Sequence, residues 1–161
     1  MDTDQLEVLV GKLLVQRGMT VALAESCTGG LVASTLTDVP GSSDYFLGGV
    51  VAYSNQAKEE LLRVRHETLL TYGAVSEQTA REMARGARRI FGADVALSVT
   101  GIAGPGGGTL EKPVGLTYIA LSAADVETCE QHIWKGNRWE NKAQSAQAAL
   151  RLLQQYLETE E

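Results

Sequence analysis

The sequence is poor in the residues that mark several common classes of protein. It contains only two cysteines, Cys27 and Cys129, which are too few for a disulfide framework. Its two histidines, His66 and His132, do not stand at the spacing of a metal-binding motif. No apolar run approaches the ~20 residues that a membrane-spanning helix needs. A disulfide-stabilised secreted domain, a zinc protein and an integral membrane protein are therefore all disfavoured.

Positive charge is also scarce, and the chain of 161 residues has a formal net charge of −6. This balance disfavours extended binding to nucleic acid, although a single phosphate can still bind locally. The first residues, Met1 to Asp4, are acidic and lack the basic segment and apolar core of a signal peptide. We therefore expect a cytoplasmic protein with no membrane and no nucleic acid among its partners.

The rest of the composition is ordinary for one globular domain. Hydrophobic residues make up 44% of the chain and charged residues 21%, and the length suffices for a core. The sequence shows no internal repeat, low-complexity segment or linker. We expect a single domain that spans residues 1–161.

Short apolar runs alternate with amphipathic segments along the chain. The runs predict strands at residues 21–24, 49–53, 94–100, 114–121 and 128–134. The amphipathic segments predict helices at residues 6–14, 31–36, 55–62 and 77–91, and a final helix up to residue 157. This alternation favours an α/β sandwich, and the close spacing of the last two strands allows an antiparallel pair in a mixed sheet.

A first candidate site follows the strand at residues 21–24. Ser26 stands at a strand-to-helix turn, with Thr28, Gly29 and Gly30 behind it. Free backbone N–H groups at a helix start can hold a substrate phosphate or a developing oxyanion. The alternative is an ordinary capping residue with turn glycines.

A second candidate is Lys58, in the first turn of the helix that Ser54 or Asn55 is expected to cap. A cation at that end opposes the helix macrodipole. The same field, together with desolvation, would lower the pKa of the amine and favour a neutral general base able to activate a serine hydroxyl. The alternative is an exposed lysine that tolerates its position.

Two further segments could bind a ligand. The loop from Thr100 to Gly108, which includes Gly101 and Gly104, is rich in glycine and follows a strand. Ligands of open α/β sheets favour such positions at the carboxyl ends of strands, although the loop fits no nucleotide-binding motif. Arg138 stands near the start of the last helix and could hold a phosphate or carboxylate, or could be a surface arginine.

Other candidates are weaker. Cys27 could replace Ser26 as the nucleophile, but a small cysteine after a buried strand more often packs. A Ser-His-Asp triad stays open, because triads are assembled in space, yet neither histidine has a neighbouring motif. The basic cluster at positions 81, 85, 88 and 89 is interpreted as a solvated helix face rather than a nucleic-acid site.

Several segments, in order, resemble the CinA C-terminal domain family (PncC). They cover roughly residues 5 to 157, nearly the whole chain. The matching runs are Ala24-Glu25-Ser26-Cys27-Thr28-Gly29-Gly30, Val39-Pro40-Gly41-Ser42-Ser43, Phe46 to Asn55, Lys58, Gly73-Ala74-Val75-Ser76, Val99 to Pro105 and Lys112-Pro113-Val114-Gly115.

The resemblance implies a three-layer α/β/α sandwich with a mixed, mostly parallel sheet, and a homodimer. It also implies a nicotinamide-nucleotide amidohydrolase that converts nicotinamide mononucleotide to nicotinic acid mononucleotide and ammonia, without a metal or other cofactor. Ser26 matches the nucleophile, Lys58 the general base and Tyr53 the tyrosine that assists them.

Two departures from the family pattern stand out. The residues after Arg138, Trp139 to Lys142, differ from the arginine-rich pattern often found there. The chain is also too short for the N-terminal domain of full-length CinA proteins, so we expect a stand-alone form. A second hypothesis is a non-catalytic nucleotide-binding or competence-associated regulatory module, and a third is a hydrolase of another amide.

Overall fold

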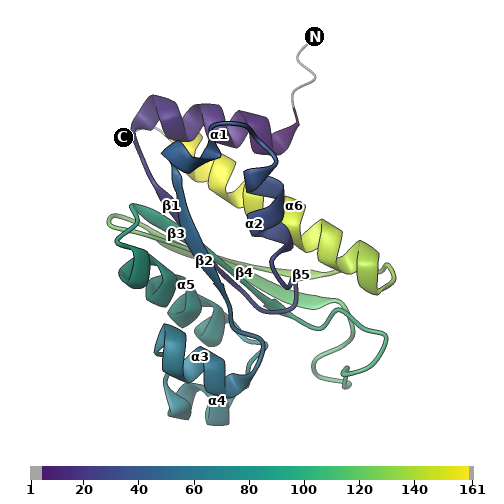
Figure 1. The fold of residues 1–161 in the computed structure, drawn as a ribbon. Coiled ribbons are helices and arrows are strands. Elements are labelled where there is room, and N and C mark those ends of the chain that lie inside the picture. The colour runs from purple at the N-terminus through teal and green to yellow at the C-terminus, as the bar shows by residue number, and fades with distance from the viewer. Residues whose placement is uncertain (1–4, 160–161) are drawn as a thin grey trace.

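One five-stranded sheet organises the protein (Figure 1). The structure is a computed structural model and describes residues 5–159, so the acidic residues 1–4 considered above lie outside it. The strands lie side by side in the order β2-β1-β3-β4-β5. Their bounds are β1 Val21–Glu25, β2 Phe46–Val51, β3 Val95–Gly101, β4 Leu116–Ala123 and β5 Glu127–Ile133.

The directions of the strands confirm a mixed, mostly parallel sheet. Strands β2 and β3 both pair with β1 in parallel. Strand β4 pairs antiparallel with β3, and β5 pairs antiparallel with β4. Four strands therefore run in one direction and β4 alone runs against them.

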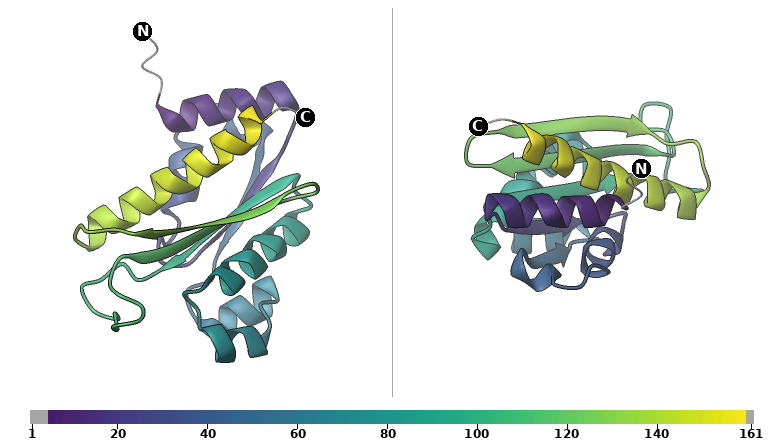
Figure 2. Two further views of the ribbon diagram at one scale, coloured as in Figure 1. Left: turned by 180° about the vertical axis from the view of Figure 1, so that it is seen from behind. Right: turned by 90° about the horizontal axis from the view of Figure 1, so that it is seen from above.

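Helices cover both faces of the sheet, which confirms the three-layer α/β/α arrangement (Figures 1 and 2). The first layer holds α1 (Leu6–Arg17), α2 (Leu31–Thr37) and α6 (Arg138–Glu158). The second holds α3 (Asn55–Leu62), α4 (His66–Tyr72) and α5 (Glu77–Phe91). A short 3-10 helix, Ser42–Asp44, precedes β2. No helix within residues 5–159 is long and apolar enough to cross a membrane.

The central strand β1 explains why its sequence is a continuous apolar run. Successive side chains of a strand point to opposite faces, and both faces of β1 are covered. Leu23 packs in the core beneath the layer of α1, α2 and α6. Ala22 and Ala24 pack on the other face with Met83 of α5.

Local sequence signals account for several helix ends. Gly18 ends α1 in the left-handed conformation (φ 62°), as expected for a glycine stop. Ser54 and Ser76 cap α3 and α5 by accepting the backbone N–H of the residue three positions later. Strand β2 ends at Val51 rather than at the predicted residue 53, and α4 was not predicted.

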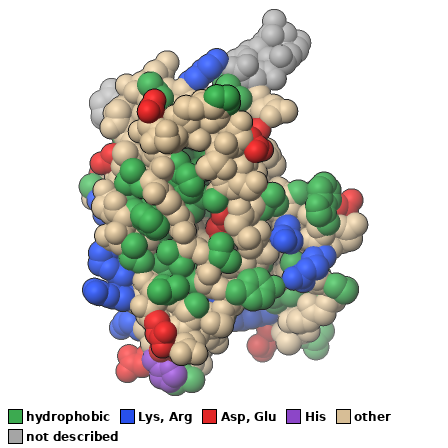
Figure 3. All heavy atoms as spheres, viewed as in Figure 1, with side chains coloured by type: hydrophobic (Ala, Val, Ile, Leu, Met, Phe, Trp, Pro, Cys, Tyr) green, Lys and Arg blue, Asp and Glu red, His purple; other side chains and the backbone are tan. Residues whose placement is uncertain are grey.

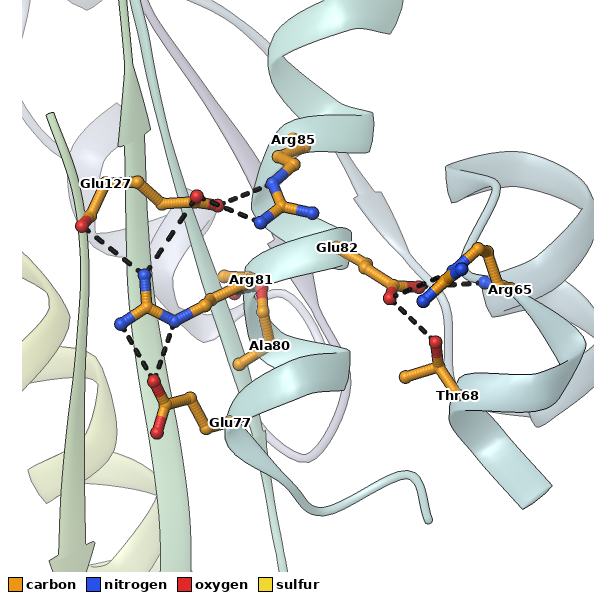
Figure 4. Close-up of polar contacts among 9 residues, drawn as sticks. Arg65, Thr68, Glu77, Ala80, Arg81, Glu82, Arg85 and Glu127 are labelled. Carbon is orange, nitrogen blue, oxygen red and sulfur yellow. Dashed lines mark hydrogen bonds and ion pairs between the residues drawn. The ribbon is translucent and has the colours of Figure 1, made fainter. Parts of the chain in front are cut away.

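The arginines on α5 hold neighbouring elements together (Figure 4). Arg81 pairs with Glu77 on its own helix and with Glu127 at the start of β5. Arg85 donates two hydrogen bonds to the same Glu127, at 2.6 and 3.0 Å. The predicted solvated face is thus partly exposed and also joins α5 to the edge of the sheet.

Candidate active site

The predicted site segments meet at one edge of the sheet, where the parallel strands β1, β2 and β3 end. Glu25 of β1 pairs with Val51 of β2 and Val99 of β3. Two further hydrogen bonds extend this pairing past the strand ends, from Ser26 N to Val99 O (3.0 Å) and from Ala52 N to Glu25 O (2.8 Å). The residues that follow the ends of β1, β2 and β3 therefore lie at the carboxyl edge of the sheet, where α/β sheets bind ligands.

Ser26 is held in place by the side chain of the residue before it. The Glu25 carboxylate is 2% exposed and reaches over the turn to the start of α2. It accepts the Thr28 hydroxyl (2.6 Å) and the backbone N–H groups of Gly30, Val32 and Ala33 (2.9 to 3.1 Å). A carboxylate at a helix N-terminus is stabilised both by these donors and by the helix dipole. Glu25 thereby fixes the turn that presents Ser26.

Lys58 meets Ser26 across the edge of the sheet. Its Nζ lies 3.0 Å from Ser26 Oγ, 3.0 Å from the carbonyl oxygen of Ala52 and 3.2 Å from that of Tyr53. The residue is 2% exposed and belongs to the first part of α3, which Ser54 caps. All three partners are uncharged oxygen atoms.

Burial without a carboxylate partner shifts the titration of this lysine. Desolvation lowers the pKa of Lys58 below its ordinary value and outweighs the opposing influence of Cys27. Desolvation also raises the pKa of the Cys27 thiol to about 12, although the charges of Lys58 and Lys142 act in the opposite direction. A thiol with so high a pKa is a poor nucleophile at neutral pH, which leaves Ser26 as the group beside the base.

The pair opens into a pocket of about 190 Å³. Thr100 and Gly101 contribute to its wall from the end of β3, and Ala74 and Val75 from the segment before α5. The Thr100 hydroxyl donates to the Ala74 carbonyl (2.9 Å) and so ties these two segments together. Gly101 is required by close packing, because a Cβ there would lie 2.6 Å from Thr117 Oγ1.

Tyr53 and Arg138 form the outer part of the same pocket. One guanidinium nitrogen of Arg138 donates to the carbonyl of Gly104 (2.7 Å), and the other donates to the Tyr53 hydroxyl (3.1 Å). The Tyr53 side chain is 61% exposed. Tyr53 therefore contacts Lys58 through its backbone carbonyl, while its hydroxyl contacts Arg138 and not the Ser26–Lys58 pair.

At the start of α2, two of the amides expected to bind an anion already have acceptors within the chain. The Gly29 N–H donates to the carbonyl of Ser26 (3.1 Å), and the Gly30 N–H donates to Glu25. The Thr28 hydroxyl is also bound to Glu25. These groups shape the turn, and of the residues after Ser26 it is Cys27 that lines the pocket.

Sequence reasoning missed two buried polar residues that organise the site. Glu25 stood inside a matched motif, yet a glutamate at a strand end gives no sign of its partners. Asn141 is 2% exposed; its side chain donates to the Ala103 carbonyl (3.0 Å) and accepts the Gly136 N–H (3.0 Å). Asn141 thus fastens the glycine-rich loop to the start of α6. Within the part of the chain that the structure describes, no group of three His, Cys, Asp or Glu side chains could hold a metal.

The fold and this edge define an α/β/α protein with a buried serine–lysine pair at the carboxyl ends of its parallel strands. The sequence model of the CinA C-terminal domain family matches residues 3–157, and the chain belongs to this family. CinA-like proteins of Desulfotalea psychrophila and Chlorobaculum tepidum are each 53% identical, over 156 and 152 residues. The chain spans 38% and 36% of their respective lengths, and the matches cover 97% and 91% of this chain.

Solved structures of the same family agree with the fold. The competence/damage inducible protein CihA of Agrobacterium tumefaciens is 41% identical and superposes with a TM-score of 0.90, over 99% of this chain and 100% of that one. A CinA superfamily protein of Klebsiella pneumoniae is 34% identical, with a TM-score of 0.92 over 98% of each chain.

Proposed function

We propose that the chain is an amidohydrolase that converts nicotinamide mononucleotide to nicotinic acid mononucleotide and ammonia, with Ser26 as nucleophile and Lys58 as general base. The observation that carries the proposal is the 3.0 Å approach of Lys58 Nζ to Ser26 Oγ, made by a lysine that is 2% exposed and faces only uncharged oxygen atoms. The choice of substrate rests on the resemblance of the motifs to the amidohydrolases of the family.

The three partners of Lys58 suit a neutral amine. A neutral amine has two N–H donors and one lone pair, and the carbonyls of Ala52 and Tyr53 can accept the two donors. The lone pair is then directed to Ser26, whose hydroxyl donates to it. Desolvation lowers the pKa of Lys58 and so favours this form. The pair is thereby set for proton transfer from oxygen to nitrogen.

The reaction follows in two halves. Ser26 Oγ attacks the carboxamide carbon as its proton passes to Lys58, and the tetrahedral intermediate collapses when Lys58 returns that proton to the departing nitrogen. Ammonia leaves, and an ester of Ser26 remains. A water molecule then attacks the ester, again with Lys58 as base, and releases the carboxylate and free Ser26.

The oxyanion of each tetrahedral intermediate needs hydrogen-bond donors. The amides of Gly29 and Gly30 already have acceptors, so in our mechanism the donors come from the backbone N–H of Thr28 or from the glycine-rich loop, where Gly101 and Ala103 line the pocket. One well-placed donor of this kind contributes about 3 to 4 kcal/mol. Arg138, at the outer part of the pocket, contacts the nucleotide.

Ammonia release from nicotinamide mononucleotide tests the proposal. We expect Ser26→Ala to release no ammonia, because it lacks the nucleophile, and Lys58→Met to lower turnover by at least about a hundredfold, the lower end of the contribution of general-base catalysis. Ser34→Ala, an exposed position on α2, and Lys135→Met, an exposed position before α6, are matched controls that should keep full activity. Undiminished turnover in either site variant would refute the mechanism.

The regulatory-module hypothesis predicts a different outcome. The wild-type protein would bind the nucleotide but release no ammonia, and Lys58→Met would bind as well as the wild type. If the protein instead hydrolyses another amide, and this activity also requires Ser26 and Lys58, the proposed mechanism stands and only the assignment of the substrate changes.

We also propose a cytoplasmic homodimer. Strand β2 lies at one edge of the sheet and exposes Leu47 and Val51. Figure 3 shows hydrophobic side chains spread over this face of the molecule. An unpaired strand edge with apolar side chains suits pairing with a second copy. Sedimentation velocity of the wild type and Val51→Lys tests this, and a monomeric wild type would exclude it.

A further inference from the structure

A groove lined by arginines lies on the protein away from the catalytic pocket. Two adjoining hollows of about 220 and 460 Å³ share Arg85 and Arg89 and follow the C-terminal half of α5. Neither hollow shares a lining residue with the pocket of Ser26 and Lys58. Figure 3 shows a group of basic side chains at the left edge of the view, where Figure 1 places α5. The lining of this arginine groove includes none of the five lysines of the chain but five of its nine arginines, namely Arg63, Arg65, Arg85, Arg88 and Arg89.

Three of these arginines keep most of their hydrogen-bonding capacity. Arg65 and Arg85 are paired with carboxylates, as Figure 4 shows. Within residues 5–159, Arg63, Arg88 and Arg89 form no ion pair. Arg88 and Arg89 each donate one hydrogen bond to a backbone carbonyl, at 3.3 and 3.4 Å, and the Arg63 side chain donates none to this part of the chain. Because a guanidinium carries five N–H donors, the groove holds positive charge and donors that the described residues leave free.

The ordinary preference of cations for helix ends explains only part of this cluster. Arg88 and Arg89 lie in the last turn of α5, where the macrodipole favours positive charge. Arg89 also supports the end of α3 by donating to the carbonyl of Leu62. Arg63 has no such role, because its backbone N–H makes the capping hydrogen bond, to the carbonyl of Glu59 (3.0 Å), and any residue could supply that group.

The backbone of Arg63 shows that an arginine at this position has a cost. Arg63 follows the last residue of α3 in the left-handed conformation (φ 57°), and it is the one residue other than glycine with a positive φ within residues 5–159. Glycine ordinarily occupies such a position, because a Cβ disfavours this conformation. Residues held in unfavourable backbone conformations cluster at functional sites. The side chain of Arg63 lines the smaller hollow, which gives this residue a reason to be there.

We infer that the arginine groove binds a small anion that contains a chain of two or three phosphate groups, either free or carried by a nucleotide. Guanidinium groups match phosphate oxygens with two parallel hydrogen bonds, which a lysine cannot make. The larger hollow, of about 460 Å³, falls within the roughly 300 to 1,000 Å³ of typical small-molecule sites. One phosphate group carries a charge of only about −1.5 to −2 at pH 7, so three unpaired arginines match more than one group. This second site is separate from the proposed amidohydrolase site and does not depend on it.

Isothermal titration calorimetry of the whole chain with inorganic tripolyphosphate tests the site. Arg63→Gly and Arg89→Gln should each weaken binding about tenfold or more, as expected for loss of charge-assisted hydrogen bonds. Arg63→Gly should also be at least as stable as the wild type in urea unfolding, because glycine adopts the left-handed conformation without strain. Weaker binding by a variant of undiminished stability distinguishes a lost ligand contact from a damaged fold. Arg151→Gln, at an exposed position on α6, is the matched control and should bind like the wild type.

Two other ligands identify the anion. Binding of ATP that is tighter than that of tripolyphosphate would indicate a nucleotide, and equal binding would indicate that the phosphate chain alone is recognised. Tighter binding of hexaglutamate than of tripolyphosphate would overturn the assignment to phosphate. The site itself is overturned if millimolar tripolyphosphate does not bind to the wild type, or if Arg63→Gly and Arg89→Gln bind it as tightly as the wild type does. These outcomes are decided whether or not the protein releases ammonia from nicotinamide mononucleotide.

Discussion

Replacing Lys58 by methionine removes a buried nitrogen and keeps an unbranched side chain that fits the same space. The variant leaves the carbonyls of Ala52 and Tyr53 without this donor, which costs about 1 kcal/mol each and about 2 kcal/mol together. The substitution also removes the free-energy cost of burying an amine away from water, which opposes this loss. The net change in the free energy of unfolding therefore depends on pH, and the direction of that dependence follows from the lowered pKa of Lys58.

The pKa of Lys58 in the folded protein lies below the ordinary lysine value of 10.5. Between these two values the unfolded chain binds more protons than the folded one, so the stability of the wild type falls as the pH is lowered through this window. The slope for one group is at most about 1.4 kcal/mol per pH unit. Lys58→Met lacks this dependence, so its stability relative to the wild type should improve as the pH falls from 10.5.

Urea unfolding at several pH values between 7 and 10.5, followed by tryptophan fluorescence, measures the difference between wild type and Lys58→Met. Other groups that titrate in this range cancel in the difference. Lys135→Met, at an exposed position, should give a much smaller pH dependence. A constant difference between wild type and Lys58→Met across the range would show that Lys58 titrates as an ordinary lysine and would refute the argument for a neutral base.

Three further substitutions test other parts of the site. Glu25→Gln replaces one acceptor oxygen by a donor, so the Ala33 N–H loses its partner, and we expect about 2 to 4 kcal/mol of destabilisation in urea unfolding. Tyr53→Phe removes the contact of the hydroxyl with Arg138 and no contact with Ser26 or Lys58. We therefore expect KM to rise by no more than about threefold, with kcat nearly unchanged. A large fall in kcat would show that the Tyr53 hydroxyl takes part directly in proton transfer. Asn141→Leu leaves the Ala103 carbonyl and the Gly136 amide unpaired, so we expect a loss of about 1 to 3 kcal/mol and a lower kcat/KM, both of which a wild-type-like variant would exclude.

Much of the fold could be predicted because its signals are local. The stop at Gly18 and the caps at Ser54 and Ser76 each depend on residues a few positions apart. The buried strand β1 was evident from its apolar run. The end of β2 was not evident from the sequence, because the apolar residues continue past Val51 while the pairing of β2 with β1 stops at Glu25.

For the site, the sequence indicated the two central residues but not the contacts between side chains. Ser26 and Lys58 were singled out by their places beside helix starts and by the family motifs, yet only the structure shows that they approach to 3.0 Å. Long-range side-chain contacts have no periodic signal, which is why the roles of Glu25 and Asn141 were missed. The contact between the Tyr53 hydroxyl and Arg138 joins residues 85 positions apart and was equally hidden.

The most direct test of the account is the detection of an ester on Ser26 during turnover. Wild-type protein mixed with nicotinamide mononucleotide, quenched rapidly in acid and measured by mass spectrometry, should gain the mass of the substrate less that of ammonia, and peptide mapping should place the gain on Ser26. Ser26→Ala should show no such adduct and release no ammonia. Release of ammonia that persists in Ser26→Ala, or an adduct that maps to another residue, would contradict the account.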